Sequence, residues 1–284
     1  MSIGTGGSRY VPREAEEFPE RLRGVKPLAK GLWVEGRLPW AAEPLVAVVG
    51  ARSASRAGCR TVSRLAGELA AAGHGVVSGG ALGVDAAAHE GALAAGGVTF
   101  AVLGCGIDII YPDRHGSLYG AVAASGGVLS EYGPGVPVRT WQFPVRNRLV
   151  AALGDAVVVA ECRSRSGALI TAQLAQQIGR LLLAIPGSPG TDSLLATGVA
   201  LAVESAGDVR AALTGALAPP RAGGLADSWA ELCAAVGRGP TAVEDLALKL
   251  RIPVAEVLAV LCEAEMAGRV RRLPGGRYEV CRGN

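Results

Sequence analysis

The most constraining feature of this sequence is a pattern that occurs twice between residues 45 and 89, where an apolar strand runs into glycines and then into a helix. The first copy reads LVAVVGARSASRAG and the second reads VVSGGALGVDAAAH. A glycine turn after a strand lets backbone N–H groups converge, and the following helix N-terminus adds partial positive charge. Two such turns predict two adjacent seats for anionic groups, which would suit a polynucleotide.

The alternation of apolar runs and helical segments continues to about residue 216. The predicted strands are VAVVG, GVVSGG, VTFAVLG, GGVLSEY, AVVVAEC, RLLLAIPG and GVALAV. Their near-continuous hydrophobicity indicates that both faces of each strand are covered, which is typical of a parallel sheet between two helical layers. The sequence therefore predicts an α/β fold with a doubly wound, Rossmann-like, mostly parallel sheet. Ligands of such sheets bind at the carboxyl ends of the strands.

Changes in composition divide the chain into four predicted parts. Residues 1–42 form an N-terminal approach segment, and residues 43–216 form the Rossmann-like domain. Residues 217–227 are a linker rich in proline, glycine and alanine. In residues 228–284 a Thr-x-x-Glu capping box at Thr241 opens one helix, a longer helix covers 254–268, and two short strands flank a Pro-Gly-Gly turn. This order predicts a winged helix-turn-helix domain.

Composition restricts the class of protein more than its function. The net charge of +3 is too small to require a nucleic-acid partner, although all basic residues except Lys26, Lys30 and Lys249 are arginines, whose planar fork suits phosphate recognition. The 6 cysteines include no CxxC pair, which favours a reducing compartment over zinc or disulfides. Because we find neither a leader nor an apolar span, we expect a cytoplasmic protein without a membrane partner.

The motifs that would indicate an enzyme are incomplete. GARSASRAG lacks the GxGxxG fingerprint, and the second strand ends in Ser-Gly-Gly without an acidic residue, so a dinucleotide cofactor is not expected. Ser78, Asp85 and His89 resemble a nucleophile with an acid and a base, yet Ser78 lacks a nucleophile elbow and Asp85 is placed to cap a helix. The 3 histidines have no nearby ligand cluster. We therefore predict no catalytic residue, no cofactor and no metal.

The segments RTWQFPVRNR and ECRSRSGALITA are the strongest feature after the repeated turns. They interleave Trp141 and Phe143 with five arginines, namely Arg139, Arg146, Arg148, Arg163 and Arg165. Basic groups for phosphates and rings for base stacking are what single-stranded nucleic acid requires. Ser166 and Gly167 open a helix at the same predicted sheet edge. The alternative is that Trp141 and Phe143 belong to the core and that the arginines pair with Glu161 and Asp155.

Several motifs together resemble the DNA-processing protein A family (DprA, also called Smf). They are VAVVGAR, VVSGGALGVDAAAHEGAL, FAVLGCGIDIIYPDRH, GGVLSEYGPG, FPVRNR, SGALITA and AIPG, and they cover roughly residues 18–210. The tail EAEMAGRVRRLPGGRYEV is similar to the winged-helix domain that many members carry. The resemblance implies a non-catalytic, dimeric protein that binds incoming single-stranded DNA during natural transformation and helps to load RecA.

The resemblance also implies which residues would line the DNA pocket. They are Arg52, Ser78, Gly79, Gly80, Arg139, Phe143, Arg146, Asn147, Ser166 and Gly167. Two other classes remain as alternatives. A Rossmann-like phosphoribohydrolase of the LOG or lysine-decarboxylase-like family would carry a PGGxGT turn followed by a glutamate, where this chain has IPGSPGTDSLL. A transcription regulator would read bases with its winged helix, but Glu256, Glu263 and Glu265 in that helix would repel phosphates.

Overall fold

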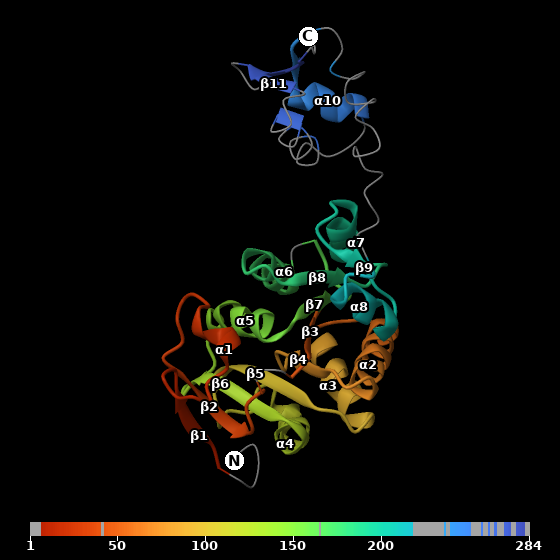
Figure 1. The fold of residues 1–284 in the computed structure, drawn as a ribbon. Helices are drawn as coiled ribbons and strands as arrows, with labels where there is room; N and C mark the ends of the chain where they lie inside the picture. Colours follow the sequence, from red (N-terminus) through yellow and green to blue (C-terminus); the bar gives the residue numbers. More distant parts are fainter. Residues whose placement is uncertain are drawn as a thin grey trace. The chain divides into compact units, whose positions relative to one another are not determined.

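The computed structural model divides the chain into two compact units, Met1–Ala218 and Pro219–Asn284 (Figure 1). In the first unit the structure describes residues 7–40, 43–164 and 166–217. In the second it describes residues 236, 239–250, 257, 261, 264–265, 270–273 and 277–281. Each unit is described separately below.

The first unit contains a mixed, mostly parallel sheet, as the sequence predicts. Its strands lie in the order β1 (Arg9–Pro12), β2 (Gly31–Gly36), β6 (Gly127–Tyr132), β5 (Thr99–Gly106), β4 (Gly75–Ser78), β3 (Leu45–Val49), β7 (Ala156–Val159), β8 (Leu181–Ala184) and β9 (Leu201–Ala202). All neighbours from β6 to β9 pair in parallel, whereas β1 and β2 are antiparallel additions at one edge. The strand order reverses between β3 and β7, which is where ligands of doubly wound sheets bind.

Helices cover both faces of this sheet (Figure 1). They are α1 (Glu20–Arg23), α2 (Arg56–Ala71), α3 (Val84–Ala94), α4 (Gly116–Ser125), α5 (Gln142–Leu153), α6 (Gly167–Gln177), α7 (Pro189–Ala196) and α8 (Ala206–Leu213), with a 3₁₀ turn at Asp113–His115. Buried residues of α2, α3 and α8 share one hydrophobic cluster, and those of α1, α5 and α6 share another. The two layers confirm the doubly wound fold class.

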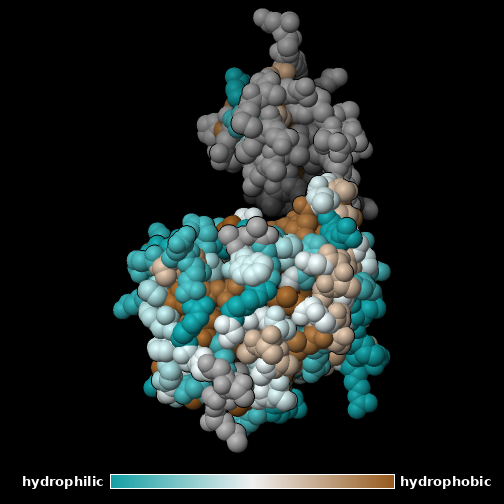
Figure 2. Space-filling model, turned by 60° about the horizontal axis from the view of Figure 1, so that its bottom comes forward, coloured by the Kyte–Doolittle hydropathy of each residue, from teal (hydrophilic) through white to brown (hydrophobic). Residues whose placement is uncertain are grey.

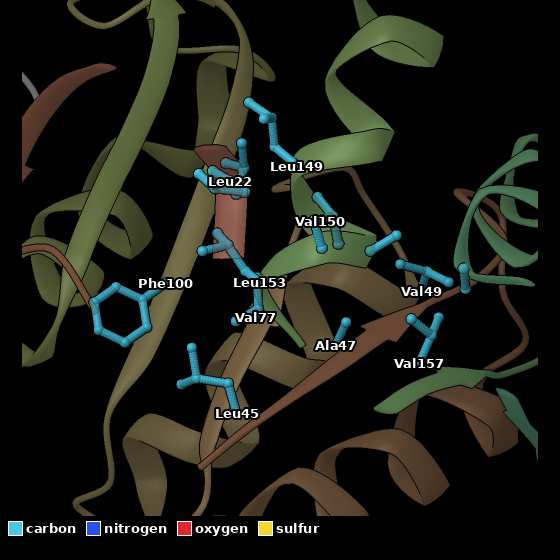
Figure 3. Close-up of a cluster of buried hydrophobic side chains, with 14 of the residues drawn as sticks. Leu22, Leu45, Ala47, Val49, Val77, Phe100, Leu149, Val150, Leu153 and Val157 are labelled. Atoms are coloured by element: carbon cyan, nitrogen blue, oxygen red, sulfur yellow. The ribbon is translucent and has the colours of Figure 1, made fainter. Parts of the chain in front are cut away.

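The hydrophobic core on the α5 side of the sheet holds helix α5 in place. Leu149, Val150 and Leu153 of α5 point toward the strands β3, β4, β5 and β7, and Leu22 of α1 joins them (Figure 3). All of these side chains are almost fully buried. Burying each one contributes about 1.5–3 kcal/mol relative to exposure. Helix α5 is therefore held firmly above the centre of the sheet.

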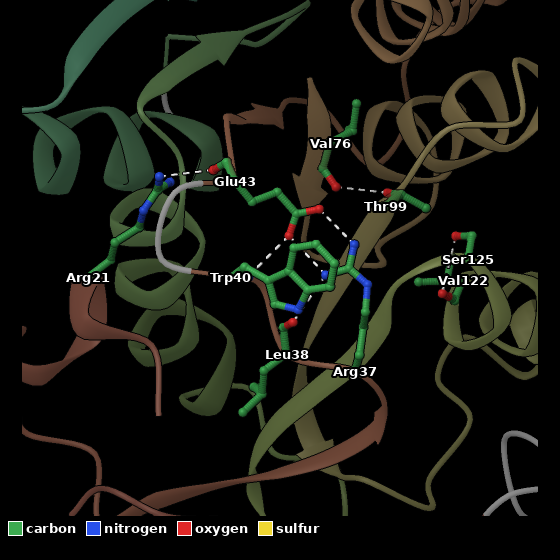
Figure 4. A network of polar contacts seen from close by, with 9 residues as sticks. All are labelled: Arg21, Arg37, Leu38, Trp40, Glu43, Val76, Thr99, Val122 and Ser125. Carbon is green, nitrogen blue, oxygen red and sulfur yellow. Dashed lines mark hydrogen bonds and ion pairs between the residues drawn. The ribbon is translucent and has the colours of Figure 1, made fainter. Parts of the chain in front are cut away.

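The N-terminal segment is tied to the sheet by pairing and by a polar network (Figure 4). Strand β2 pairs with β6, and Leu32 and Val34 of β2 are buried. The Arg37 guanidinium binds both carboxylate oxygens of Glu43 at 2.9 and 2.7 Å, which raises the pKa of Arg37. Arg21 donates to the Glu43 carbonyl at 3.0 Å. These contacts anchor the segment beside the parallel part of the sheet.

The second unit has the three-stranded sheet of a winged domain and a helix that follows its first strand. Strand β10 (Thr241–Ala242) precedes α10 (Val243–Leu250), and the hairpin strands β11 (Val270–Leu273) and β12 (Arg277–Val280) pair in antiparallel fashion, as predicted. The Thr241 hydroxyl donates to the carbonyls of Val236 and Gly239. Thr241 belongs to β10, just before α10, and the Glu244 side chain of the predicted capping box lies outside the described residues. The predicted linker and most of the predicted helix at 254–268 lie outside the described residues.

The surface of the first unit mixes polar and apolar side chains (Figure 2). On the face shown, hydrophilic residues surround smaller groups of hydrophobic ones. Such a mixture is normal, because more than half of a folded protein's accessible surface is apolar. Among the described residues, no helix combines the length and the apolar character that crossing a membrane requires.

Candidate nucleic-acid interface

A cleft of about 410 Å³ opens at the carboxyl ends of β3 and β4, beside the point where the strand order reverses. Its walls come from the loops after these strands and from α5 and α6. Seven of the ten residues that the resemblance implies line it, namely Arg52, Gly79, Phe143, Arg146, Asn147, Ser166 and Gly167. Gly80 borders a smaller adjoining cavity of about 80 Å³. The expected residues thus converge from four separate stretches of sequence.

The helical period of α5 explains which side chains of its segment face the cleft. Phe143, Arg146, Asn147 and Val150 line it, at the i, i+3, i+4 and i+7 spacing of one helix face. Arg148 points elsewhere and forms a two-pronged ion pair with Glu131 at 2.6 Å for each oxygen. The aromatic–basic alternation seen in the sequence therefore does not produce one continuous binding face.

Arg146 lines the floor of the cleft and is almost fully buried there. The residue is 4% exposed. Its guanidinium donates hydrogen bonds to the carbonyls of Gly79, just after β4, and of Val102, within β5. A Cβ at Gly79 would collide with this guanidinium, so glycine at that position makes room for it. Burial lowers the pKa of Arg146, although the neighbouring Asp85 carboxylate opposes this shift. Arg146 supplies fixed positive charge and holds the glycine turn.

The turn after β4 is clamped from a second side. The hydroxyl of Tyr119 lies 2.9 Å from the Gly80 carbonyl, and His115 Nδ1 lies 3.1 Å from the same oxygen. Gly80 has φ of 81°, and a Cβ there would press on the Tyr119 hydroxyl. Ser78 is fully buried in the sheet, and its Oγ donates to the Val48 carbonyl at 2.6 Å. Ser78 therefore joins β4 to β3 and does not line the cleft.

An arginine and a ring stack at the cleft. The Arg52 guanidinium carbon lies 4.8 Å from the centroid of the Phe143 ring, within the range of a cation–π interaction. The Tyr111 ring lies 5.6 Å from the Phe143 ring at an interplanar angle of 33°. Tyr111 is 40% exposed and Phe143 is partly buried. Trp141 is 56% exposed and therefore does not belong to the core, contrary to the alternative, whereas Phe143 is only partly buried.

The anion seat that the first glycine turn predicts is occupied by a carboxylate of the chain itself. Glu161, two residues after β7, accepts hydrogen bonds from the backbone N–H of Ser55 at 2.8 Å and from its hydroxyl at 2.6 Å. Ser55 is the N-cap of α2. A Cβ at Gly58 would collide with the Glu161 carboxylate, which shows how closely that group covers the helix terminus. A phosphate at this terminus would have to displace Glu161.

The second predicted seat, at the N-terminus of α3, is also closed by internal contacts. The Val84 N–H donates to the Ala51 carbonyl at 3.1 Å, and the Asp85 carboxylate accepts from the Ala81 N–H at 3.1 Å. Burial raises the pKa of Asp85, and the charge of Arg146 opposes that shift. The prediction of two open seats side by side is therefore wrong. At α2 the contact comes from Glu161 of another loop, whereas at α3 it comes from Ala51 and from Asp85 of the helix itself.

The N-terminus of α6 remains accessible at the cleft. The Ser166 hydroxyl accepts a hydrogen bond from the Ala168 N–H at 3.3 Å. Gly167 is exposed, and a Cβ built on it would have no other atom within 4 Å. Ser166 and Gly167 both line the cleft. This helix N-terminus lies at the sheet edge where the sequence predicts it, and Arg52 lines the same cleft.

Three further arginines of the predicted segments fall outside this cleft or outside the description. Arg139 is exposed, and its backbone N–H donates to Gln142 Oε1 at 2.6 Å, but its side chain does not line the cleft. Arg163 lines a neighbouring cleft. Arg165 lies outside the described residues. The expected pairing of these arginines with Glu161 and Asp155 does not occur among the described contacts, because Glu161 binds Ser55 and Asp155 binds Arg21 at 3.1 Å.

The side chains of the apparent catalytic set serve structural contacts. The Ser78 hydroxyl donates to the Val48 carbonyl, and the Asp85 carboxylate accepts from the Ala81 N–H. His89 is fully buried with Nδ1 2.7 Å from the Thr99 hydroxyl. Burial lowers the pKa of His89 to about 3, so the ring is neutral. Among the described residues, no group of three or more His, Cys, Asp or Glu side chains could hold a metal ion.

Sequence reasoning missed two contributors to the cleft. Tyr111 contacts Phe143 although it follows β5 by five residues in a loop. In the sequence, the YPDRH motif that begins at Tyr111 indicates only the family resemblance. Asp85 lines the cleft as well as bonding Ala81, and the sequence assigned it only a capping role. The signal that could have found both is their position after the carboxyl end of a parallel strand.

Comparisons with known proteins assign the chain to a family. The model of DNA recombination-mediator protein A matches residues 9–214, and that of the DprA winged helix domain matches residues 216–276. Protein Smf of Escherichia coli is 35% identical over 283 residues, which cover 94% of this chain and 76% of that protein.

Two solved structures are similar to the first unit. DNA processing protein A from Streptococcus pneumoniae has a TM-score of 0.67 at 37% identity, covering 72% of this chain and 74% of that one. The protein of the same name from Helicobacter pylori, described for its single-stranded DNA binding mode, has a TM-score of 0.68 at 31% identity, covering 76% and 99%. The fold, the relatives and both family models agree, and the chain belongs to the DNA recombination-mediator protein A family.

Proposed function

We propose that this protein binds single-stranded DNA in the cleft between α5 and α6. The observation that carries the proposal is the juxtaposition of Arg52, Phe143 and the accessible N-terminus of α6 at Ser166 and Gly167. A guanidinium and exposed backbone N–H groups suit phosphates, while the Phe143 and Tyr111 rings suit unpaired bases. A base in a duplex could not reach these rings without leaving its stack.

The residues divide into direct and indirect contributors in this proposal. Arg52, Phe143, Asn147, Ser166 and Gly167 would contact the strand. Gly79 and Gly80 would shape the floor, with Arg146 and Ser78 holding them from below. Arg139 is exposed close to the start of α5 and would contact the strand outside the cleft. The relative from Helicobacter pylori, described for its single-stranded DNA binding mode, supports the class of ligand in this proposal.

The family membership supports a wider biological proposal. The protein would protect incoming single-stranded DNA during natural transformation in the cytoplasm and load RecA onto it for homologous recombination. It would act as a homodimer. Sedimentation at micromolar concentration would test the dimer, and a strand-exchange assay with RecA would test loading. A monomer, or an unchanged lag in strand exchange, would contradict these two parts separately.

We also propose that the cleft performs no chemistry. The hydroxyl of Ser78 and the ring of His89 are buried and bonded to other groups of the sheet and its helices. The competing phosphoribohydrolase function would need a glutamate after the IPGSPGTDSLL turn, and this chain has none there. In that turn Asp192 accepts from the Gly187 N–H at 2.8 Å. Release of a base from AMP that an Arg52→Ala change abolishes would favour the enzyme.

The decisive experiment compares oligothymidylate, a duplex of equal length and a nucleoside monophosphate over a salt series by fluorescence anisotropy. We expect tightest binding to the single strand, with a log–log salt slope of about −0.7 for each phosphate contacted. Equal or tighter binding of the duplex at matched salt would contradict the proposal. Arg210→Ala is a matched control, because Arg210 is an exposed arginine on α8.

A further inference from the structure

A second cleft of about 540 Å³ lies next to the first, beyond Arg52 and Ser166. It is bounded by the loop after β3, the loop after β7 and the turn that begins α7. Ser53, Ser55, Arg163, Gly187 and Ser188 contribute to its walls. Arg52 and Ser166 line both clefts, so the two spaces meet along one shared wall.

The arginines that line the second cleft make it favourable for a phosphate. Arg163 is exposed, and its guanidinium has no ion pair or hydrogen bond among the contacts of the described residues. Arg52 likewise contacts the Phe143 ring but no carboxylate in that part of the chain. By contrast Arg148 and Arg21 are paired with carboxylates. The two cleft arginines therefore keep their charge available for an external anion.

The second cleft also contains a carboxylate, which is already held by hydrogen bonds. Glu161 is bound to the backbone N–H and hydroxyl of Ser55 at the N-terminus of α2. The positive end of that helix offsets its charge. The N-terminus of α7 is also satisfied internally, because the Gly190 N–H donates to the Cys162 carbonyl at 2.8 Å. We therefore expect a strand in this cleft to contact Arg52 and Arg163.

We propose that one DNA strand occupies both clefts in succession, and that Arg163 contacts a phosphate in the second. This inference rests on the proposed single-stranded DNA binding and extends it from one cleft to a track. Because the shared wall contains Arg52 and Ser166, a phosphate there would mark the passage from one cleft to the other. A short oligonucleotide would fill the first cleft alone, and a longer one would reach Arg163.

The test measures affinity against oligonucleotide length. Oligothymidylates from about 3 to about 12 nucleotides are titrated into the full-length protein and into Arg163→Ala, Arg52→Ala and the Arg210→Ala control. For Arg163→Ala we expect unchanged affinity for the shortest oligomers that bind. For long oligomers we expect a loss of about tenfold, the scale of one charged hydrogen bond, and a salt slope smaller by about 0.7. Arg52→Ala should weaken binding at every length.

The outcomes separate this inference from the function on which it rests. If the unmodified protein binds oligomers but Arg163→Ala loses affinity equally at all lengths, or at none, the track is overturned while single-stranded DNA binding stands. If the unmodified protein binds no oligomer at any length, both are overturned. Thermal melts of each variant check folding, and Arg163 and Arg210 are both exposed, so we expect melting temperatures unchanged from the unmodified protein.

Discussion

An arginine in a nucleic-acid cleft usually suggests a phosphate contact, but the arginines of this protein differ in what they can reach. Arg146 is buried and bonded to the carbonyls of Gly79 and Val102. Arg52 is exposed and stacked on Phe143. A buried guanidinium cannot move to a ligand without leaving two carbonyl groups unpaired, which is costly. Arg146 therefore supplies fixed positive charge at the floor of the cleft, and Arg52 supplies positive charge at its mouth.

The stack of Arg52 on Phe143 leads to a prediction of coupled effects. Arg52→Ala should weaken binding of all sequences and reduce the salt slope by about 0.7. Phe143→Ala should cost about 1–3 kcal/mol of binding through lost stacking. Because the ring also positions the guanidinium, we expect the double variant to lose less than the sum of the two losses. Salt-series titrations of the three variants measure this coupling.

Thermal melts provide the control for the same series. Phe143 is partly buried, so Phe143→Ala should lower stability by less than the about 3–5 kcal/mol of a core phenylalanine. A loss of that full size, with normal binding by the folded fraction, would show that Phe143 acts in packing. Strict additivity of the two binding losses would show that the cation–π contact does not orient Arg52.

His89 gives a prediction about pH. Its Nδ1 faces the Thr99 hydroxyl, which itself donates to the Val76 carbonyl, so the ring donates through Nδ1. Burial lowers the pKa of His89 to about 3, and the charges of His115 and Arg146 act in the same direction. The unfolded chain, with a histidine pKa of about 6.5, binds a proton below that pH and the folded chain does not. Stability should therefore fall between about pH 6.5 and pH 3.

Urea unfolding at several pH values measures the contribution of His89 to the free energy of unfolding. The His89 contribution should reduce the free energy of unfolding by up to about 1.4 kcal/mol per pH unit within that window. His89→Gln keeps a side-chain donor for Thr99 but does not titrate, so its stability should fall less steeply with acid. Parallel pH profiles for the two proteins would show that His89 gains a proton in the folded state.

At the scale of elements, patterns that depend on one segment were predictable and pairings between segments were not. The seven predicted strands are β3 to β9, because apolar runs covered on both faces are distinctive. Strands β1 and β2 were not predicted. Within β1 only Val11 is buried, and its pairing depends on the exposed edge of β2. In the second unit likewise, the hairpin was predicted, but the hydrogen bond from the Thr241 hydroxyl to the Val236 carbonyl was not.

The candidate site follows the same rule. The resemblance placed Phe143 and Asn147 in the cleft, and the structure brings them there on one face of α5. The position of Glu161 over α2 depends on a contact between residues 106 apart in sequence. No local pattern indicates that contact, so the sequence could not separate the covered N-terminus of α2 from the accessible one of α6. The seat at α6 is accessible because no carboxylate from another loop covers it among the described contacts.

Helix α6 therefore gives the element-scale prediction. Gly167→Ala adds a methyl group at the first residue of the helix, where no atom lies within 4 Å. Stability should be unchanged or higher by up to about 1 kcal/mol, because alanine favours a helix over glycine. DNA affinity should fall, because the methyl group limits the approach of a phosphate to the helix N-terminus. Anisotropy titrations alongside thermal melts measure both quantities.

A matched control for this change lies on α8. Gly207 is the second residue of that helix, and a Cβ there would meet the Ser205 hydroxyl at 3.4 Å, an ordinary contact. Gly207→Ala should leave DNA affinity unchanged. Equal affinities for the Gly167→Ala variant and the unmodified protein would mean that phosphates do not approach the N-terminus of α6.

At the scale of the whole molecule, the two units have separate hydrophobic cores. Buried residues of the first unit form clusters on both sides of its sheet, whereas Leu246, Val270 and Tyr278 belong to a cluster of the second unit. The chain can be divided near residue 218 without cutting any described helix or strand. All residues proposed to contact DNA belong to the first unit. The winged domain is therefore not needed for the proposed cleft or track.

This separation makes a final prediction about a shortened chain. Residues 1–217 alone should fold, because their core is complete without the second unit, and should bind long oligothymidylate with the affinity and salt slope of the full chain. Each phosphate contact contributed by the winged domain would instead reduce the slope of the shortened chain by about 0.7. Circular dichroism checks folding, and anisotropy over the salt series measures the slope. A markedly smaller slope for folded 1–217 would place part of the DNA interface on the winged domain, whose Arg271 and Arg277 are exposed.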